Sequence, residues 1–325
     1  MGQLQNGRWV THPQGNRPST SRQQNDGFRG WVTATGETGP GGERGFKAEK
    51  GRYHLYVSLA CPWAHRTLIF RELKQLKDYI GITIVDPLLL DNGWEVDDPL
   101  YNFEFLYQLY LKADPGYEGR VTVPVLWDKH SGTMVGNESS DIIRMLNSAF
   151  DHLTGNTDDY YPMSLRLVID SINHRVYETI NTGVYKAGFA RDQSGYQQAV
   201  ESLFKSLDWV EGLLSRQRYL AGDRISEADW RLFTTLVRFD AVYYGHFKCN
   251  KYRLVDYPAL LNYVRELYQV PGVANTVDLD QIKRHYYLSH RDINPKGLIP
   301  AGPEHSFAAS HNRGRMSATC EMSQL

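Results

Sequence analysis

The sequence predicts two domains of different class, an α/β domain followed by an all-helical domain. Strand-like and helix-like segments alternate between residues 51 and 150, whereas only helical spacing of apolar residues is found from about 160 to 300. The length of 325 residues agrees with this division, because it exceeds the size of one average domain.

The elements of the α/β half follow one another in a simple order. Residues 1–50 are polar and rich in glycine, which predicts an extended N-terminal arm. The segments 52–60, 62–76 and 80–90 then have the patterns of a strand, a helix and a strand, which together form a βαβ unit. Two short strands in "VTVPVLWD" and "TMVGN" follow, and a helix begins at "ESSDIIRMLNSAF".

The second half begins after a polar linker at 151–162. Apolar residues keep helical spacing over 165–180 and 200–210, and Ser226 and Asp229 have the spacing of a capping box at the start of a third helix. Pro258 fits the first turn of another helix, and a last one covers about 279–290. The tail 301–325 is predicted to be disordered.

Composition limits the kinds of partner. Thirty-six basic and 37 acidic residues give a formal charge of -1, so no overall field favours nucleic acid or an anionic membrane. No run approaches the roughly 20 apolar residues of a membrane-spanning helix, and the first residues lack the apolar core of a signal peptide. We therefore expect a cytoplasmic protein whose partners are small molecules.

Cys61 is the residue whose role decides the function. It stands in "SLACPWAHRTL", between a strand and the first turn of a helix, where unpaired N–H groups and the helix dipole favour a thiolate. Pro62 suits the first helical position, and such a site can lower a thiol pKa from ~8.5 to roughly 3.5–7.5. The alternative is a buried cysteine that only packs, and the position at a helix start favours the reactive thiol.

Other cysteine chemistry is less favoured. The three cysteines are too few and too scattered for a disulfide framework or a zinc cluster. Ala64 replaces the second cysteine of a C-x-x-C motif, so an external thiol must resolve any disulfide formed on Cys61. A metal site through Cys61 and His65 would need ligands that the segment does not supply, and a Cys–His pair would lack an orienting acid. We predict no metal.

Longer motifs carry a resemblance to a known family. The order of elements, with "VTVPVLWD" before "NESSDIIRML", is similar to that of cysteine-type glutathione transferases. More narrowly, "YHLYVSLACPWAHRTLI", "DNGWEVDD", "EFLYQLYLKADP", "NTGVYKAGFA" and "TLVRFDAVY" resemble the glutathionyl-hydroquinone reductases, the Xi class, over most of residues 5–300. The resemblance implies a thioredoxin-like N-terminal domain and a helical glutathione-transferase C-terminal domain.

The resemblance also implies a set of site residues. Cys61 would be the nucleophile, and the residues that match glutathione-binding positions are Trp94, Arg120, Val121, Thr122, Val123, Glu138 and Ser139. A cis peptide before Pro124 would leave the Val123 backbone free to pair with the cysteinyl part of glutathione. Glu138 would accept from the γ-glutamyl ammonium, and Ser139 would bind the γ-glutamyl carboxylate at a helix start.

Three tyrosines match positions that the family places around the sulfur. Tyr185 is assigned as proton donor and acceptor, and Tyr243 and Tyr286 as donors that stabilise the thiolate, a task that phenol groups suit. The adjacent Tyr244 and Tyr287 are the alternatives at the last two positions.

The implied activity is the glutathione-dependent reduction of S-glutathionyl-hydroquinones. It would proceed through a mixed disulfide between Cys61 and glutathione, which a second glutathione resolves. An omega-like thiol transferase or dehydroascorbate reductase would share Cys61 and the glutathione site. A non-catalytic interaction module on the same fold is the alternative from another class. The family also implies a homodimer.

Overall fold

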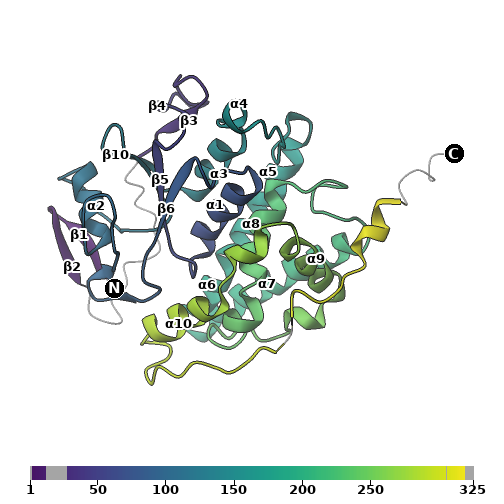
Figure 1. Cartoon of the computed structure of the whole chain (residues 1–325). Coiled ribbons are helices and arrows are strands. Elements are labelled where there is room, and N and C mark those ends of the chain that lie inside the picture. Colours follow the sequence, from purple (N-terminus) through teal and green to yellow (C-terminus); the bar gives the residue numbers. More distant parts are fainter. Residues whose placement is uncertain (1, 12–27, 305, 319–325) are drawn as a thin grey trace. The chain divides into compact units, whose positions relative to one another are not determined.

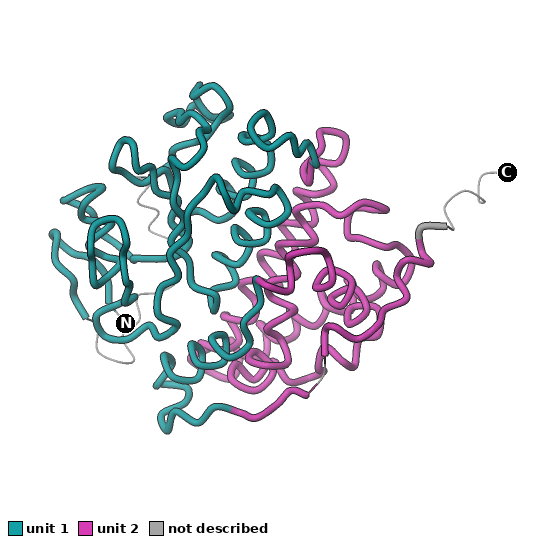
Figure 2. The backbone as a smooth tube through the Cα atoms, viewed as in Figure 1, with its two compact units in different colours: residues 1–158, 276–299 teal, residues 159–275, 300–325 magenta. Residues whose placement is uncertain are grey.

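Two compact units make up the chain in a computed structural model, which describes residues 2–11, 28–304 and 306–318. Unit 1 comprises Met1–Asp158 and Thr276–Ile299, and unit 2 comprises Asp159–Asn275 and Pro300–Leu325 (Figure 2). Unit 1 is therefore assembled from two stretches of sequence that lie more than a hundred residues apart. The predicted fold class, an α/β domain followed by a helical one, is confirmed.

A four-stranded mixed sheet forms the centre of unit 1 (Figure 1). Its strand order is β10–β9–β5–β6, with bounds Thr133–Gly136, Val125–Asp128, Tyr53–Val57 and Ile80–Ile84. Strand β5 is buried along its whole length, and it pairs in parallel with β6 and antiparallel with β9. The predicted strand 80–90 divides in two, because residues after Ile84 leave the sheet and form the ribbon of β7 (Leu89–Leu90) and β8 (Gly93–Trp94).

Helices cover both faces of this sheet. The helices of unit 1 are α1 (Pro62–Leu73), α2 (Leu106–Ala113), α3 (Ser139–Ser148), α4 (Asp151–Thr154) and α10 (Leu279–Ser289). Helices α1 and α3 pack together on one side of the strands, and α2 lies on the other side against β8 and β10 (Figure 1). The sequence did not predict α2, whose start is capped when Gln108 Oε1 accepts a hydrogen bond from the Phe105 N–H at 2.9 Å.

The described part of the N-terminal arm forms two small sheets. Strands β1 (Gly2–Gln5) and β2 (Arg8–Thr11) make an antiparallel hairpin, and β3 (Trp31–Thr33) runs parallel to β4 (Gly45–Lys47). Leu4 is fully buried and exchanges two backbone hydrogen bonds with Gly119. The hairpin is therefore attached to the domain by the buried Leu4 side chain and by backbone hydrogen bonds. The part of the predicted arm at 12–27 lies outside the described residues.

Unit 2 is helical throughout its regular structure. It contains α5 (Arg166–Val176), which continues as a π-helical turn at Tyr177–Asn181, and then α6 (Gly183–Gly188), α7 (Gln193–Leu214), α8 (Glu227–Leu236) and α9 (Pro258–Tyr268). The capping box of α8 is confirmed, since Asp229 Oδ2 accepts from the Ser226 N–H at 2.7 Å. Pro258 begins α9 as predicted. Among the described residues no helix has the length and apolar character needed to cross a membrane.

Two segments differ from the simple division into halves. Helix α10, which the sequence assigns to a helical domain at 160–300, belongs to unit 1. In the tail that the sequence predicts to be disordered, residues 306–318 pack on unit 2. The reason is Arg313, which is buried and donates to the carbonyls of Leu214 at 2.9 Å and Gln217 at 2.8 Å. The spacing of residues in the sequence does not show that the Arg313 guanidinium is buried. The remaining domain boundaries stay predictions.

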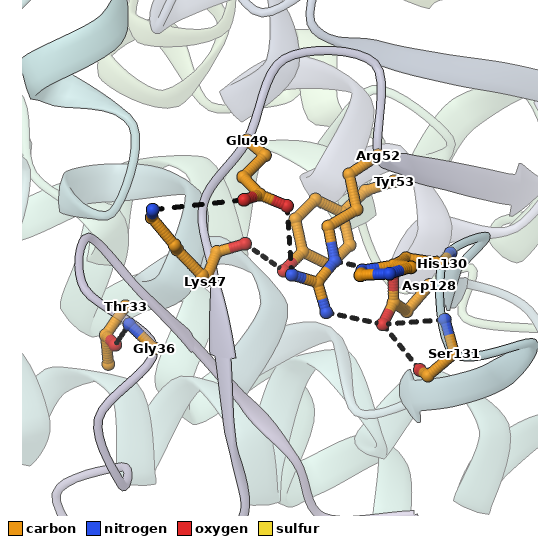
Figure 3. A network of polar contacts seen from close by, with 9 residues as sticks. All are labelled: Thr33, Gly36, Lys47, Glu49, Arg52, Tyr53, Asp128, His130 and Ser131. Carbon is orange, nitrogen blue, oxygen red and sulfur yellow. Dashed lines mark hydrogen bonds and ion pairs between the residues drawn. The ribbon is translucent and has the colours of Figure 1, made fainter.

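A network of hydrogen bonds and ion pairs lies at the start of β5, around Arg52 and Asp128 (Figure 3). Arg52 donates from Nε and Nη2 to the two carboxylate oxygens of Asp128, each at 2.7 Å, and from Nη1 to Glu49 at 3.1 Å. Asp128 is fully buried, and Ser131 Oγ donates to it at 2.5 Å. Burial raises the pKa of Asp128, but the hydrogen bonds from Arg52 and Ser131 outweigh it and hold the pKa below its usual 3.8.

Replacing Arg52 with Met is expected to lower the free energy of unfolding by about 3–5 kcal/mol, because the Asp128 carboxylate is left buried without its partner. The folded-state pKa of Asp128 is depressed, so this stabilisation is present above the unfolded pKa and is lost as the pH falls through the folded pKa. Urea denaturation at pH 7 and pH 3 measures the difference. The same substitution in an Asp128→Asn background is the control and should cost much less. A loss that is equal at both pH values would contradict the prediction.

Candidate functional site

Cys61 lies at the junction of β5 and α1, as predicted. It is the N-cap residue of α1, and its carbonyl accepts the His65 N–H at 3.0 Å while Pro62 occupies the first helical position. The thiol is half-buried, and Sγ lies 3.6 Å from the Val123 carbonyl oxygen. The positive end of the α1 dipole therefore acts on a sulfur atom that remains partly accessible, which is the setting of a reactive thiolate.

The segment 120–123 runs beside Cys61 and ends in the predicted cis peptide, Val123–Pro124. Tyr110 holds this segment: its hydroxyl donates to the Thr122 carbonyl at 2.8 Å and accepts from the Thr122 N–H at 3.2 Å. Burial raises the pKa of Tyr110, which keeps the hydroxyl protonated as this pair of bonds requires. Val121 and Val123 are buried and Arg120 is exposed, so the segment presents its backbone and the Arg120 side chain.

Glu138 and Ser139 lie at the start of α3. Glu138 is the N-cap residue, and its carboxylate accepts from the Ser140 N–H at 3.2 Å. Ser139 is buried, and its hydroxyl accepts from Arg66 Nη1 at 3.4 Å. Arg66 is itself buried and lies over the Trp63 ring, 4.5 Å from its centroid. A guanidinium and a helix N-terminus thus meet at Ser139, and both favour an anion.

Trp94 lies in β8, where it pairs with Leu89. Its indole is 5% exposed and stacks on the imidazole of His285, with ring centroids 5.3 Å apart and an interplanar angle of 14°. The N-terminal hairpin supports the same ribbon, because Trp9 Nε1 donates to the Asp91 carbonyl at 2.7 Å. The Trp94 ring is therefore held by the His285 stack, and the ribbon that carries it is supported by the N-terminal hairpin.

Tyr286 belongs to α10 and hence to unit 1. Its side chain is buried, and its ring contacts His290 edge to face at 5.5 Å. Unit 1 thereby brings Cys61, Trp94, the segment 120–123, Glu138, Ser139 and Tyr286 into one compact body. Their assignment to glutathione and to the sulfur stays a prediction.

Tyr185 and Tyr243 lie together in unit 2. Their ring centroids are 6.0 Å apart at 60°, and both rings contact Phe247. Tyr185 is half-buried, whereas Tyr243 is fully buried. The motif "GVYKAGF" needs its second glycine here, since a Cβ on Gly188 would lie 2.3 Å from the Phe247 ring.

The structure describes two of the remaining candidates for cysteine or metal chemistry, Cys249 and His65, and both are buried. Cys249 is fully buried, and burial raises its pKa to about 12. Cys320 lies outside the described residues. The imidazole of His65, four residues after Cys61, is buried and bonds the Thr276 hydroxyl at 2.7 Å. Within residues 2–11, 28–304 and 306–318, His, Cys, Asp and Glu side chains form no group of three that could hold a metal ion.

Sequence reasoning missed the side chains that hold the predicted site in place. These are Arg66 behind Ser139, Tyr110 behind Thr122, and His285 behind Trp94. A signal was available for two of them, because Arg66 ends the motif "CPWAHR" and His285 directly precedes Tyr286. Tyr110 lies in the motif "EFLYQLYLKADP", but that motif contains two tyrosines and its pattern does not say which of them contacts Thr122.

Comparison with known proteins assigns the chain to a family. Models of the glutathione S-transferase N-terminal and C-terminal domains match residues 60–149 and 193–266. The chain is 53% identical to glutathionyl-hydroquinone reductase YqjG of Escherichia coli (strain K12), over 96% of this chain and 98% of that protein. It is 51% identical to glutathionyl-hydroquinone reductase PcpF of Sphingobium chlorophenolicum, over 80% of this chain and 86% of that one.

Solved structures agree with this assignment. The glutathione-bound structure of Escherichia coli YqjG has a TM-score of 0.89 at 53% identity and covers 96% of this chain and 99% of its own. A Xi class glutathione transferase from Natrialba magadii has a TM-score of 0.91 at 43% identity, with 97% and 98% covered. Fold and sequence together define a glutathione transferase. Within that superfamily, the chain belongs to the Xi class, the glutathionyl-hydroquinone reductases.

Iodoacetamide at pH 7 is expected to alkylate Cys61 in the native protein and to leave Cys249 unmodified. Cys61 is half-buried at a helix start, whereas the raised pKa of Cys249 keeps that sulfur as a buried, neutral thiol. Peptide mass spectrometry after a short reaction measures both sites. Guanidinium-denatured protein is the control, in which both cysteines should react. Equal labelling of the two cysteines in native protein would contradict the prediction.

Proposed function

We propose that this chain is an enzyme that reduces S-glutathionyl-hydroquinones to hydroquinones at the expense of glutathione. The observation that carries the proposal is the Cys61 thiol at the start of α1, in a chain 53% identical over 96% of its length to a named glutathionyl-hydroquinone reductase. The glutathione-bound structure of that relative supports glutathione as the co-substrate.

The first half-reaction transfers glutathione to the enzyme. The Cys61 thiolate attacks the sulfur of the S-glutathionyl-hydroquinone, a sulfur–sulfur bond forms, and the bond from sulfur to the aromatic carbon breaks. The aromatic carbon takes a proton from Tyr185 and leaves in the free hydroquinone. The carbon is reduced, and the two sulfur atoms are oxidised to the mixed disulfide.

The second half-reaction regenerates the thiol. A second glutathione loses its thiol proton, which restores the proton of Tyr185, and its thiolate attacks the glutathione sulfur of the mixed disulfide. This step releases oxidised glutathione and the Cys61 thiolate. Ala64 stands where a resolving cysteine would be, which agrees with the use of an external thiol. The sum of both steps converts one S-glutathionyl-hydroquinone and one glutathione into one hydroquinone and one oxidised glutathione.

The side chains of unit 1 offer a matching set of groups for glutathione. Trp94 and Arg120 would hold the glycyl end, and the Val123 backbone would pair with the cysteinyl residue next to Cys61. At the γ-glutamyl end, Ser139 would bind the carboxylate and Glu138 the ammonium group. Arg66 supports this arrangement, because it donates to Ser139 and leaves the serine proton available for the anion.

The tyrosines would assist at the sulfur. Tyr243 and Tyr286 would donate hydrogen bonds that stabilise the thiolate, and Tyr185 would move the proton of the leaving hydroquinone. The half-buried position of Tyr185 at the edge of an aromatic cluster in unit 2 suits a group that must meet a flat aromatic substrate.

Cys61→Ser is expected to lower kcat on an S-glutathionyl-hydroquinone by at least about a thousandfold, because the nucleophile is lost. Tyr185→Phe should lower kcat by about a hundredfold and leave KM nearly unchanged, since it removes only the proton donor. Chromatographic quantification of free hydroquinone in the presence of glutathione measures both. Intact-mass analysis of the wild type after treatment with oxidised glutathione should show one glutathione adduct, absent from Cys61→Ser.

Cys249→Ala is the matched control and should retain wild-type turnover, because that thiol only packs. Undiminished turnover by Cys61→Ser would rule out the mechanism. The substrate class is tested separately against a glutathione mixed disulfide and dehydroascorbate. Faster turnover of these than of the hydroquinone conjugate would favour an omega-like activity.

The protein is further proposed to act as a cytoplasmic homodimer, as its family resemblance implies. Light scattering coupled to gel filtration is expected to give about twice the chain mass of 37.3 kDa. A mass of one chain across the micromolar range would contradict this.

A further inference from the structure

His285 and Ser289 of helix α10 contact the segment 87–94, which contains the β7–β8 ribbon, in three places within unit 1. The imidazole Nδ1 of His285 lies 2.6 Å from the Pro87 carbonyl oxygen, and the Leu89 N–H donates to Ser289 Oγ at 3.0 Å. The third contact is the stack of the His285 ring on Trp94. His285 and Ser289 are four residues apart, so both lie on the face of α10 that meets the ribbon.

The chemistry of the first contact fixes the histidine ring. A carbonyl oxygen can only accept, so the proton is assigned to Nδ1, which donates to Pro87. The ring is 8% exposed and lies within 14° of parallel to the indole of Trp94. Because the hydrogen bond sets the plane of the imidazole, it also sets the plane against which Trp94 packs.

The residue after His285 is Tyr286. The two rings meet edge to face at 5.1 Å, and the His290 ring contacts both Tyr286, at 5.5 Å, and His285, at 5.8 Å. His285 therefore contacts Trp94 of the ribbon and Tyr286 of its own helix. The first of these is assigned to the glycyl end of glutathione, and the second to its sulfur.

We propose that His285 is a positioning residue for glutathione: it holds the Trp94 indole in its binding orientation and ties the position of Tyr286 to it. This inference rests on the proposed function, because that function assigns Trp94 and Tyr286 to glutathione. By linkage, glutathione bound against Trp94 would stabilise the stack of His285 on Trp94, and loss of this stack would weaken glutathione binding.

The test is calorimetric measurement of glutathione binding to the full-length protein. His285→Ala is expected to weaken binding by about tenfold, the order of one lost aromatic pair. His285→Phe keeps a ring on Trp94 but loses the hydrogen bond to Pro87, so it should bind about threefold more weakly than the wild type, between the wild type and His285→Ala. Ser289→Ala is the matched control: it removes a contact between the same helix and ribbon without touching Trp94, and it should bind within about twofold of the wild type.

A double-mutant cycle with Trp94 separates positioning from general destabilisation. If His285 acts through Trp94, the variant with both Trp94→Ala and His285→Ala should bind no more weakly than Trp94→Ala alone. Additive losses would overturn the inference, as would equal weakening by Ser289→Ala and His285→Ala. If His285→Ala fails to fold, a loss of about threefold in His285→Phe supports the inference, and an unchanged affinity or a tenfold loss in that variant overturns it.

The outcomes distinguish this inference from the proposed function. A wild-type protein that binds no glutathione would refute the proposed function. A wild-type protein that binds glutathione, together with a His285→Ala variant that binds equally tightly, would refute only the role of His285.

Discussion

The pairing of β5 decides where the site lies. Strand β9 runs antiparallel to β5 and sets Val125 opposite Tyr56. The residues that precede β9 therefore meet the residues that follow β5 at one end of these two strands. Cys61 and Val123 come together there, at 3.6 Å. At the other end of the same two strands, Asp128 lies opposite Tyr53 and is bonded to Arg52. A slip of one residue would turn every side chain of the buried strand and break this ion pair.

Local signals explain why much of the fold could be predicted from sequence. The predicted elements depend on residues that are close together in the sequence. Prolines mark the starts of α1 and α9, and a capping box marks the start of α8. The placement of α10 in unit 1 has no such signal. It depends on His285 and Pro87, which are 198 residues apart, and on His65 and Thr276, which are 211 apart. Periodicity predicts that a helix forms and does not predict what it packs against.

The residues of the candidate site also fall into two groups, those that the sequence indicated and those that only the structure shows. Chemistry alone singled out Cys61, because a thiol at a helix start has a distinctive setting, while the glutathione positions came from the family resemblance. The residues behind them act by contact with another side chain or carbonyl. Arg66 touches Ser139, and Tyr110 touches Thr122, and neither contact leaves a spacing pattern in the sequence. Such supporting residues become visible only when the chain is folded.

Residues 276–299 belong to unit 1 although they follow unit 2 in the sequence, and this limits how the chain can change in evolution. A recombination event near residue 159 would replace the whole later half, and with it the face of α10 that carries His285 and Ser289. The helix that replaces α10 would then have to pack against the segment 87–94, although its sequence was not selected for that contact. An exchange of the later half alone is therefore expected to disrupt unit 1, and substitutions in the segment 87–94 are expected to require matching substitutions in α10.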